Sequence, residues 1–220
     1  ISSKEVKKEF IFFAIKGNKT NGENYISDAV NKGATVIICS KKCQFKSKSI
    51  IVIKTLNIRK LLSEIVSRFY KLKPKNIIAV TGTNGKTSVA DFYYQILNIN
   101  KIKAASIGTL GIKYNNKIIK NNLTSPDTIT LHKNLEVLKK NNINNVIIEA
   151  SSHGLAQKRL NNLNFKAGIF TNFSQDHLDY HKTMKAYLNA KMILFSHLLP
   201  KNSYIISDQS NKQFSILKKI

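Results

Sequence analysis

Residues 77–87 read IIAVTGTNGKT, and this stretch decides the fold of the chain. Four apolar residues predict a buried strand over 77–80, and Gly82 and Gly85 then allow a tight loop. Helical periodicity from Lys86 onward predicts a helix over 86–99. A strand, a glycine-rich loop ending in Gly-Lys-Thr and a helix form a phosphate-binding loop. The stretch therefore predicts a nucleotide site, with ATP as the expected ligand.

Each polar residue of this loop has an expected role. The loop N–H groups and the start of the helix offer a site for phosphate oxygens. Lys86 is expected on the β- and γ-phosphates, and the Thr87 hydroxyl on Mg²⁺. Val80 stands where the longer phosphate-loop pattern has glycine, so the loop is a shortened variant. The alternative is a tight turn that happens to contain Gly-Lys-Thr.

Apolar strands alternate with helical patterns along the rest of the chain, which predicts an α/β fold. Further strands are expected over 10–15, 36–39, 50–53, 104–107, 146–148, 167–170 and 204–206, and further helices over 25–32, 58–71, 128–141 and 184–198. The central strands are wholly apolar, which favours a parallel sheet with helices on both faces. Pro74 interrupts the pattern, so we expect a small N-terminal α/β domain over 1–72 and a second, parallel-sheet domain over 73–220.

The composition and charge of the chain limit the classes of function that it can have. The formal charge of +24 is consistent with a nucleic-acid partner, but only three of the 36 basic residues are Arg, and the lysines are spread along the chain. We therefore expect compositional bias and no nucleic-acid partner. Cys39 and Cys43 lack the spacing of a zinc or redox pair, which favours two thiols in a cytoplasmic protein. No apolar run is long enough for a membrane span. The start lacks Met and a signal pattern, and the end reads as a helix in progress, so we expect a piece of a longer protein.

Two further segments carry candidate ligands. Glu149 follows the apolar strand 146–148, at the edge where α/β sheets bind ligands. It is either a Mg²⁺ ligand or a strand-end carboxylate facing water. Residues 171–181 read TNFSQDHLDYH, in which Asp176, His177, Asp179 and His181 are either a metal cluster or solvated loop residues.

The same segments resemble one family. The loop TGTNGKT, residues 81–87, resembles the ATP loop of the Mur ligase superfamily, which includes folylpolyglutamate synthetases. The segments EASSHGL at 149–155, TNFSQDHLDYH at 171–181 and YLNAK at 187–191 resemble the MurE branch in particular. LTSPD at 123–127 is similar to the Thr-Thr-Pro loop of this branch, with Ser125 in the second Thr position. From the residues alone, LTSPD predicts a proline turn, with Asp127 or Thr128 capping the next helix.

The resemblance implies the site residues. It implies catalytic roles for Lys86, Glu149, His177 and Lys191, and ATP contacts for Gly82, Thr83, Asn84, Gly85, Lys86, Thr87, Ser88 and Asn172. It implies two Mg²⁺ ions, on Thr87, Glu149, His177 and a carbamylated Lys191, since carbamylation turns the amine into a carboxylate. Substrate contacts are implied for Ile1, Ser3, Asn18, Lys19, Thr20, Thr124, Ser125, Ser151, Gln157 and Arg159. Ser2 and Lys4 depart from the Asp and Arg that the family has in the uridine-binding domain.

The implied activity is a two-step amide ligation. ATP phosphorylates the D-glutamate carboxylate of UDP-N-acetylmuramoyl-L-alanyl-D-glutamate (UDP-MurNAc-L-Ala-D-Glu), and the amine of an amino acid displaces the phosphate. Whether meso-diaminopimelate or L-lysine is added stays open, because the C-terminal domain that would select it is not in this sequence. We expect a monomer, and we expect the 220 residues alone to bind nucleotide weakly without turnover. The alternatives are another Mur ligase, a folylpolyglutamate synthetase or a basic nucleic-acid-binding module.

Overall fold

Three parallel strands in the order β1-β2-β3 organise residues 1–62, the smaller of the two units into which the chain divides. The computed structural model describes residues 2–17, 20–121 and 123–220. The smaller unit contains the strands β1 (Ile11–Phe13), β2 (Val36–Ser40) and β3 (Ile51–Thr55), the short 3₁₀ helices η1 (Ser3–Glu5) and η2 (Gly22–Tyr25), and the helix α1 (Ile26–Asn31). Its core joins Phe12 and Ile37 of the sheet to Ile26 and Ala29 of α1.

Both cysteines lie in this smaller unit as free thiols. Cys39 is the last but one residue of β2, and Cys43 follows after a lysine-rich turn, yet both side chains are buried. Burial, followed by contact with Cys43, raises the pKa of the Cys39 thiol to about 12. A thiol with such a pKa is protonated at neutral pH, which makes it a packing residue and a poor nucleophile.

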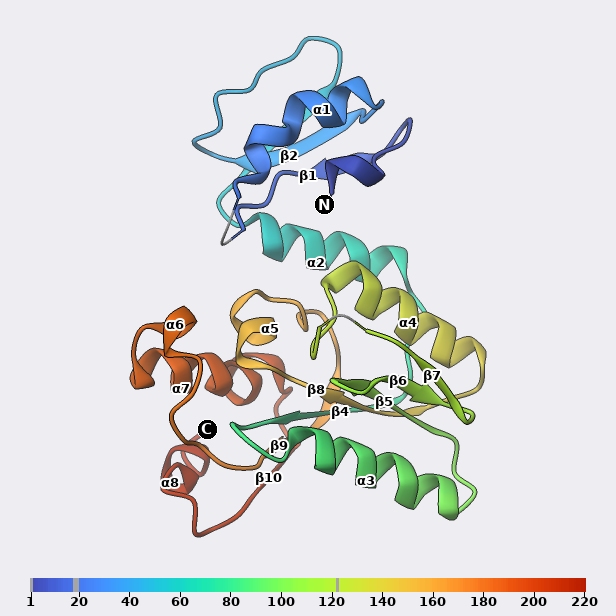
Figure 1. Cartoon of the computed structure of the whole chain (residues 1–220), viewed down its shortest axis with the longest axis vertical. Helices are drawn as coiled ribbons and strands as arrows, with labels where there is room; N and C mark the ends of the chain where they lie inside the picture. The colour runs from blue at the N-terminus through green and yellow to red at the C-terminus, as the bar shows by residue number, and fades with distance from the viewer. Residues whose placement is uncertain (1, 18–19, 122) are drawn as a thin grey trace. The chain divides into compact units, whose positions relative to one another are not determined.

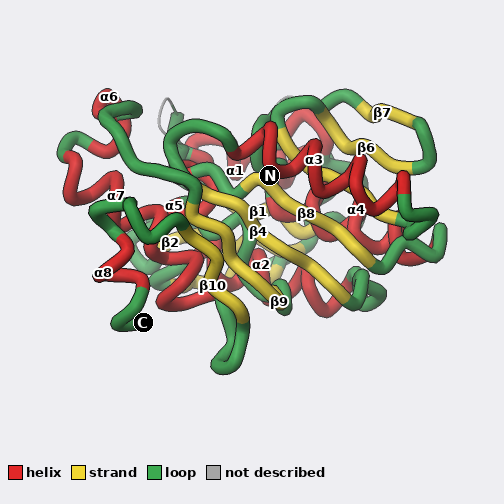
Figure 2. Tube along the Cα trace, turned by 90° about the horizontal axis from the view of Figure 1, so that it is seen from below, coloured by secondary structure: helices red, strands yellow, loops and turns green. Residues whose placement is uncertain are grey.

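The boundary between the two units, after residue 62, falls inside helix α2 (Ile58–Phe69). The larger unit, residues 63–220, is built on a seven-stranded sheet in the order β10-β9-β4-β8-β5-β6-β7. Figure 2 shows its long strands lying side by side. The strands are β4 (Asn76–Thr81), β5 (Ala104–Gly108), β6 (Gly111–Tyr114), β7 (Lys117–Ile119), β8 (Asn145–Glu149), β9 (Phe165–Phe170) and β10 (Tyr204–Ser207). The first five strands in this order pair parallel, as the apolar runs predict.

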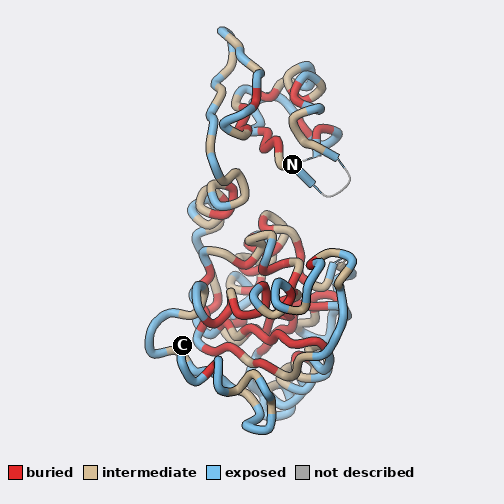
Figure 3. The backbone as a smooth tube through the Cα atoms, turned by 90° about the vertical axis from the view of Figure 1, so that its left-hand side faces the viewer, coloured by how far each residue is buried: buried red, intermediate tan, exposed pale blue. Residues whose placement is uncertain are grey.

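Helices cover both faces of the larger sheet, with α3 (Lys86–Ile99) on one face and α4 (Thr128–Lys140) on the other (Figure 1). The α4 side holds the main core, in which Leu131 and Leu135 pack with Ile148 of β8 and Phe165 of β9. The strands of the sheet form the buried centre of the unit in Figure 3. The remaining helices are α5 (Ser152–Ala156), α6 (Leu178–His181), α7 (Met184–Ile193), a π-helical turn (Leu194–Leu198) and α8 (Phe214–Leu217). The predicted α/β class and mainly parallel sheet are confirmed.

In the larger unit, the sequence patterns missed two strands and two short helices. The sequence patterns predict no strand or helix between residues 107 and 128, but β6 and β7 form an antiparallel hairpin there, at the edge of the sheet. Asn115 and Asn116 connect them with φ values of 46° and 58°, as a two-residue hairpin turn with positive φ requires. The segments after β8 and β9, where no helix was predicted, contain the short helices α5 and α6. Among the described residues, no helix is long and apolar enough to cross a membrane.

Candidate active site

The phosphate loop connects β4 to α3 in the predicted order. Gly82 has φ 149° and Gly85 has φ 82°, and Gly85 is the N-cap of α3. A Cβ on Gly82 would lie 1.9 Å from Thr171 Oγ1, so only glycine fits there. Lys86 Nζ donates to the carbonyl oxygens of Gly82 at 3.0 Å and Thr83 at 2.7 Å. The ammonium group is therefore folded back over the loop, at the place where the phosphates are expected.

Residues that follow β9 brace this loop. The Asn172 side chain accepts from Asn84 N–H at 2.9 Å, and its backbone carbonyl accepts from Thr83 N–H at 3.0 Å. Thr171 Oγ1 donates to the Asn84 carbonyl at 2.6 Å. Asn172 was predicted to contact ATP, and in the structure it holds the loop in shape.

Glu149 ends β8 in the interior, with an exposed fraction of 1%. Its carboxylate accepts hydrogen bonds from Thr87 Oγ1 at 2.9 Å, from Thr109 N–H at 2.9 Å and from Thr109 Oγ1 at 3.2 Å. Of the two interpretations left open by the sequence, the strand-end carboxylate facing water is wrong. Parallel pairing of β4 with β8 brings Glu149 beside the phosphate loop. A carboxylate and a hydroxyl this close are oxygen donors of the kind that Mg²⁺ prefers.

Ser125 and Ser151 form a second group next to Glu149. Ser125 Oγ donates to the Glu149 carbonyl at 2.7 Å and lies 2.9 Å from Ser151 Oγ, which caps α5 by accepting from Gly154 N–H. Arg159 donates to the Ser125 carbonyl at 2.7 Å and to Gln157 Oε1 at 2.7 Å. Asp127 is the N-cap of α4, as the proline-turn reading predicts.

Lys191 lies on α7 with an exposed fraction of 1%. Its Nζ donates to the Gly82 carbonyl at 2.6 Å and stands 4.3 Å from the centroid of the Tyr187 ring. Burial, followed by the charge of Lys86, lowers the pKa of Lys191 from 10.5 to about 7. A substantial share of this amine is therefore neutral at physiological pH, which distinguishes it from an ordinary surface lysine.

His177 and His181, from residues 171–181, cluster with His153 of α5. The ring of His153 lies 4.9 Å from that of His177 and 5.4 Å from that of His181, and His181 Nε2 is 3.0 Å from Ser152 Oγ. Burial, followed by neighbouring histidines, lowers the pKa of His153 and of His181. Among the described residues, no three His, Cys, Asp or Glu side chains form a metal-binding group. The Asp and His side chains of residues 171–181 therefore do not form a group of three metal ligands by themselves in this structure.

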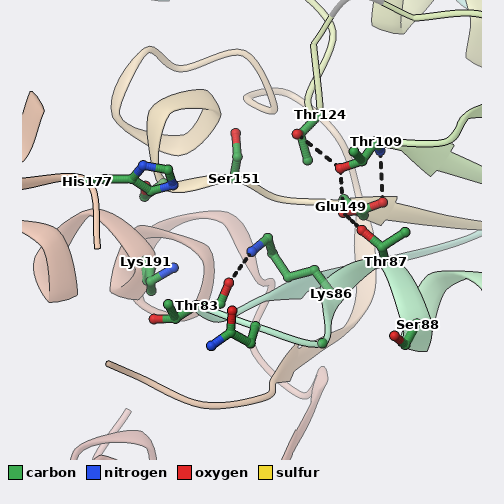
Figure 4. A pocket seen from close by; sticks show the side chains of 13 residues that line it. Thr83, Lys86, Thr87, Ser88, Thr109, Thr124, Glu149, Ser151, His177 and Lys191 are labelled. Carbon is green, nitrogen blue, oxygen red and sulfur yellow. Dashed lines mark hydrogen bonds between the residues drawn. The ribbon is translucent and has the colours of Figure 1, made fainter. Parts of the chain in front are cut away.

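One cavity of about 260 Å³ joins these groups at the carboxyl ends of the strands (Figure 4). It is lined by Thr83, Asn84, Gly85, Lys86, Thr87, Ser88, Thr109, Thr124, Glu149, Ser151, Ser152, His177 and Lys191. The lining includes all four residues expected to be catalytic. The cavity is not lined by Ser125, which is fully buried, or by Gln157 or Arg159.

The predicted uridine contacts belong to the smaller unit. Ser3 is buried in η1, and Thr20 is exposed. Ile1, Asn18 and Lys19 lie outside the described residues. The uridine pocket expected from these five residues therefore stays a prediction.

Thr109 and Ser152 line the cavity and were not among the predicted site residues. Thr109 follows Gly108, the last residue of β5, at the same sheet edge as Glu149. That position was the available signal, because parallel strands place the residues after their carboxyl ends together.

Comparison with known proteins agrees with this geometry. Residues 80–219 match the description "Mur ligase middle domain", and residues 1–70 match "Mur ligase family, catalytic domain". The chain belongs to the Mur ligase family. Within it, the chain is 43% identical over 212 residues to the UDP-N-acetylmuramoyl-L-alanyl-D-glutamate–2,6-diaminopimelate ligase of Rickettsia conorii. The ligase of the same name from Brucella melitensis is 41% identical over 201 residues. The predicted resemblance to MurE-type ligases is confirmed.

The coverage of these relatives is partial. The match to the Rickettsia protein spans 94% of this chain and 44% of the relative, and the Brucella match spans 91% and 41%. A solved structure of a ligase with the same name superposes with a TM-score of 0.82 at 27% identity, over 99% of this chain and 44% of that one. The chain thus spans less than half the length of the relatives it matches.

Proposed function

We propose that this chain forms the nucleotide-binding and acyl-phosphate-forming part of an ATP-dependent amide ligase. The substrates would be UDP-MurNAc-L-Ala-D-Glu and meso-diaminopimelate, in peptidoglycan precursor synthesis. The observation that carries the proposal is the single cavity that joins Lys86, Glu149, His177 and Lys191. The names of the relatives supply the substrates, and diaminopimelate is favoured over lysine on that ground.

The chemistry follows from what the cavity can hold. The γ-phosphate of ATP is transferred to the D-glutamate carboxylate, and the incoming amine then attacks the acyl phosphate and releases phosphate. Such transfers depend on positioning and charge neutralisation more than on a protein nucleophile. Gly82–Thr87 would cradle the phosphates, with Lys86 turning from its present carbonyl partners to the phosphate oxygens.

In their present chemical form, the residues that line the cavity fit one of the two expected Mg²⁺ ions. Glu149 and Thr87 supply oxygen donors next to the phosphate loop, and bound Mg²⁺ would neutralise phosphate charge there. A second ion would need Lys191 in another chemical form, because an ammonium group repels a cation. The neutral amine can add carbon dioxide, forming an N–C bond and releasing a proton, which leaves a carboxylate near His177. The lowered pKa of Lys191 makes the neutral amine available for this step.

A ligation assay tests the proposal. The complete gene product that contains this chain is incubated with ATP, Mg²⁺ and UDP-MurNAc-L-Ala-D-Glu, and phosphate release is measured with diaminopimelate or L-lysine. We expect release with diaminopimelate. Release with lysine alone would correct the amino acid, and a requirement for another acceptor, such as a folate, would overturn the assignment.

The same assay tests the carbamate. Lys191→Ala is expected to lose activity and to regain part of it when a short carboxylate is added, because the added group can replace the missing one. Lys185→Ala, an exposed position on the same helix, is the matched control. Full activity of untreated Lys191→Ala would rule the carbamate out.

A further inference from the structure

Thr109 supplies two of the three hydrogen bonds that fix the Glu149 carboxylate. Its N–H donates to Oε1 and its hydroxyl donates to Oε2, so it binds both oxygens, while Thr87 binds Oε2 alone. Thr109 itself is exposed at the rim of the cavity, and Glu149 lies buried beneath it. Figure 4 shows the two residues facing each other. An exposed residue thus binds both oxygens of a buried carboxylate.

The residue before Thr109 makes this contact possible. A Cβ on Gly108 would lie 1.9 Å from Glu149 Oε1 and 2.4 Å from its Cδ. Any side chain at position 108 would therefore displace the carboxylate. The Gly108–Thr109 pair combines space for the Glu149 side chain with two donors that hold it.

We propose that Thr109 is a positioning residue for Glu149, and that it couples Glu149 to the loop containing Thr124. The proposal rests on the proposed function in one respect, namely that Glu149 serves the Mg²⁺–nucleotide site. Thr124 belongs to the predicted substrate-binding loop, and its Oγ1 lies 3.1 Å from Thr109 Oγ1.

The direction of the hydrogen bonds follows from counting protons. The Thr109 hydroxyl has one proton, and it donates this proton to Glu149 Oε2, because a carboxylate oxygen is an acceptor. Thr109 Oγ1 then accepts a hydrogen bond from the Thr124 hydroxyl. The hydrogen bonds therefore run from Thr124 to Thr109 and from Thr109 to Glu149. The hydroxyl of Thr124 has no second proton to give, so toward a ligand it acts as an acceptor. The substrate group that meets Thr124 should therefore be an N–H or O–H donor.

Two effects of Thr109 on Mg²⁺ binding oppose each other. Hydrogen bonds to a carboxylate withdraw charge from its oxygens, which weakens their attraction for a cation. They also hold a flexible side chain in one rotamer, so that the side-chain entropy of Glu149 is already lost before a cation binds. Because Thr109 N–H and Thr87 still donate when the hydroxyl is removed, the charge effect changes little. We expect the loss of ordering to dominate.

Calorimetric titration of Mg²⁺–ATP into the 220-residue chain tests the positioning role. Thr109→Val removes the hydroxyl and keeps the N–H, and it should weaken Mg²⁺-dependent ATP binding severalfold, whereas Thr109→Ser should restore it. Thr130→Val is the matched control, because it removes a similar hydroxyl-to-carboxylate bond, to Asp127, outside the cavity. Unchanged or tighter binding by Thr109→Val would overturn the proposal.

A double-variant comparison tests the link to Thr124. If the chain of hydrogen bonds exists, Thr124→Val should weaken Mg²⁺-dependent binding in the wild type and have no further effect in Thr109→Val. Equal effects in both backgrounds would overturn the coupling.

A ligand-free crystal structure separates failure of this inference from failure of the proposed function. In Thr109→Val and in Gly108→Ala, the Glu149 side chain should leave its present position or lose its order, while Thr130→Val keeps it. If the wild type does not bind Mg²⁺–ATP, the proposed function fails, and the side-chain position still decides the role of Thr109. If Glu149 stays in place in Thr109→Val, the positioning role is wrong.

Discussion

At the scale of single residues, the burial of Lys191 makes the stability of the protein depend on pH. Its folded-state pKa of about 7 lies well below the ordinary value of 10.5, because burial penalises the ammonium and Lys86 repels it. Between these two pH values the unfolded chain binds a proton that the folded chain does not. The free energy of unfolding therefore rises with pH across this window, by at most about 1.4 kcal/mol per pH unit.

Lys191→Met should remove this pH dependence. The variant is expected to be more stable than the wild type near pH 7, where folding must remove a proton from Lys191. The gap should narrow toward pH 10, because removing that proton from the unfolded chain costs less free energy as the pH rises. Urea unfolding at several pH values, in buffer free of carbon dioxide, measures the gap. Lys185→Met, at an exposed site on α7, should show no such trend. A constant gap for Lys191→Met would contradict the assigned burial of charge.

At the scale of elements, the start of α4 shows how a local signal specifies a helix. Pro126 and Asp127 precede the apolar periodicity, and the Asp127 side chain accepts from Ile129 N–H at 3.0 Å and Thr130 N–H at 3.1 Å. These bonds satisfy two donors that the helix itself leaves unpaired. The cap also fixes the point at which the preceding loop, which contains Thr124 and Ser125, joins the helix.

Asp127→Ala should destabilise the larger unit by about 1 kcal/mol, the usual effect of losing an N-cap. Asp127→Asn keeps the accepting oxygen and should cost much less. Urea midpoints measured at unchanged slope give the difference. Equal stability of Asp127→Ala and the wild type would show that the cap is dispensable.

At the scale of the whole molecule, the chain corresponds to less than half of the relatives it matches. We expect the 220 residues alone to bind Mg²⁺–ATP weakly and to release no phosphate with UDP-MurNAc-L-Ala-D-Glu and diaminopimelate. The phosphate loop is formed within this chain, whereas the relatives have further sequence that this chain does not match. Calorimetry and a phosphate assay on the same preparation check both parts. Turnover by the 220 residues would prove the expectation wrong.

The sequence by itself determined the α/β class, the strand–loop–helix order around Lys86 and the Mur ligase family. Those properties depend on periodicity and on motifs a few residues long, which neighbours in the chain specify. The hairpin of β6 and β7 could also have been predicted from the sequence, because Asn115 and Asn116 tolerate the positive φ that its turn requires.

The tertiary structure decided what the motifs do together. Lys191 reaches the Gly82 carbonyl across 109 residues, and Glu149 meets Thr87 and Thr109 only because β8 pairs between β4 and β5. The lowered pKa of Lys191 likewise comes from burial, which no local pattern specifies. The physical reason is that strand pairing and desolvation are long-range properties of the packed chain, whereas a phosphate loop is encoded within seven consecutive residues.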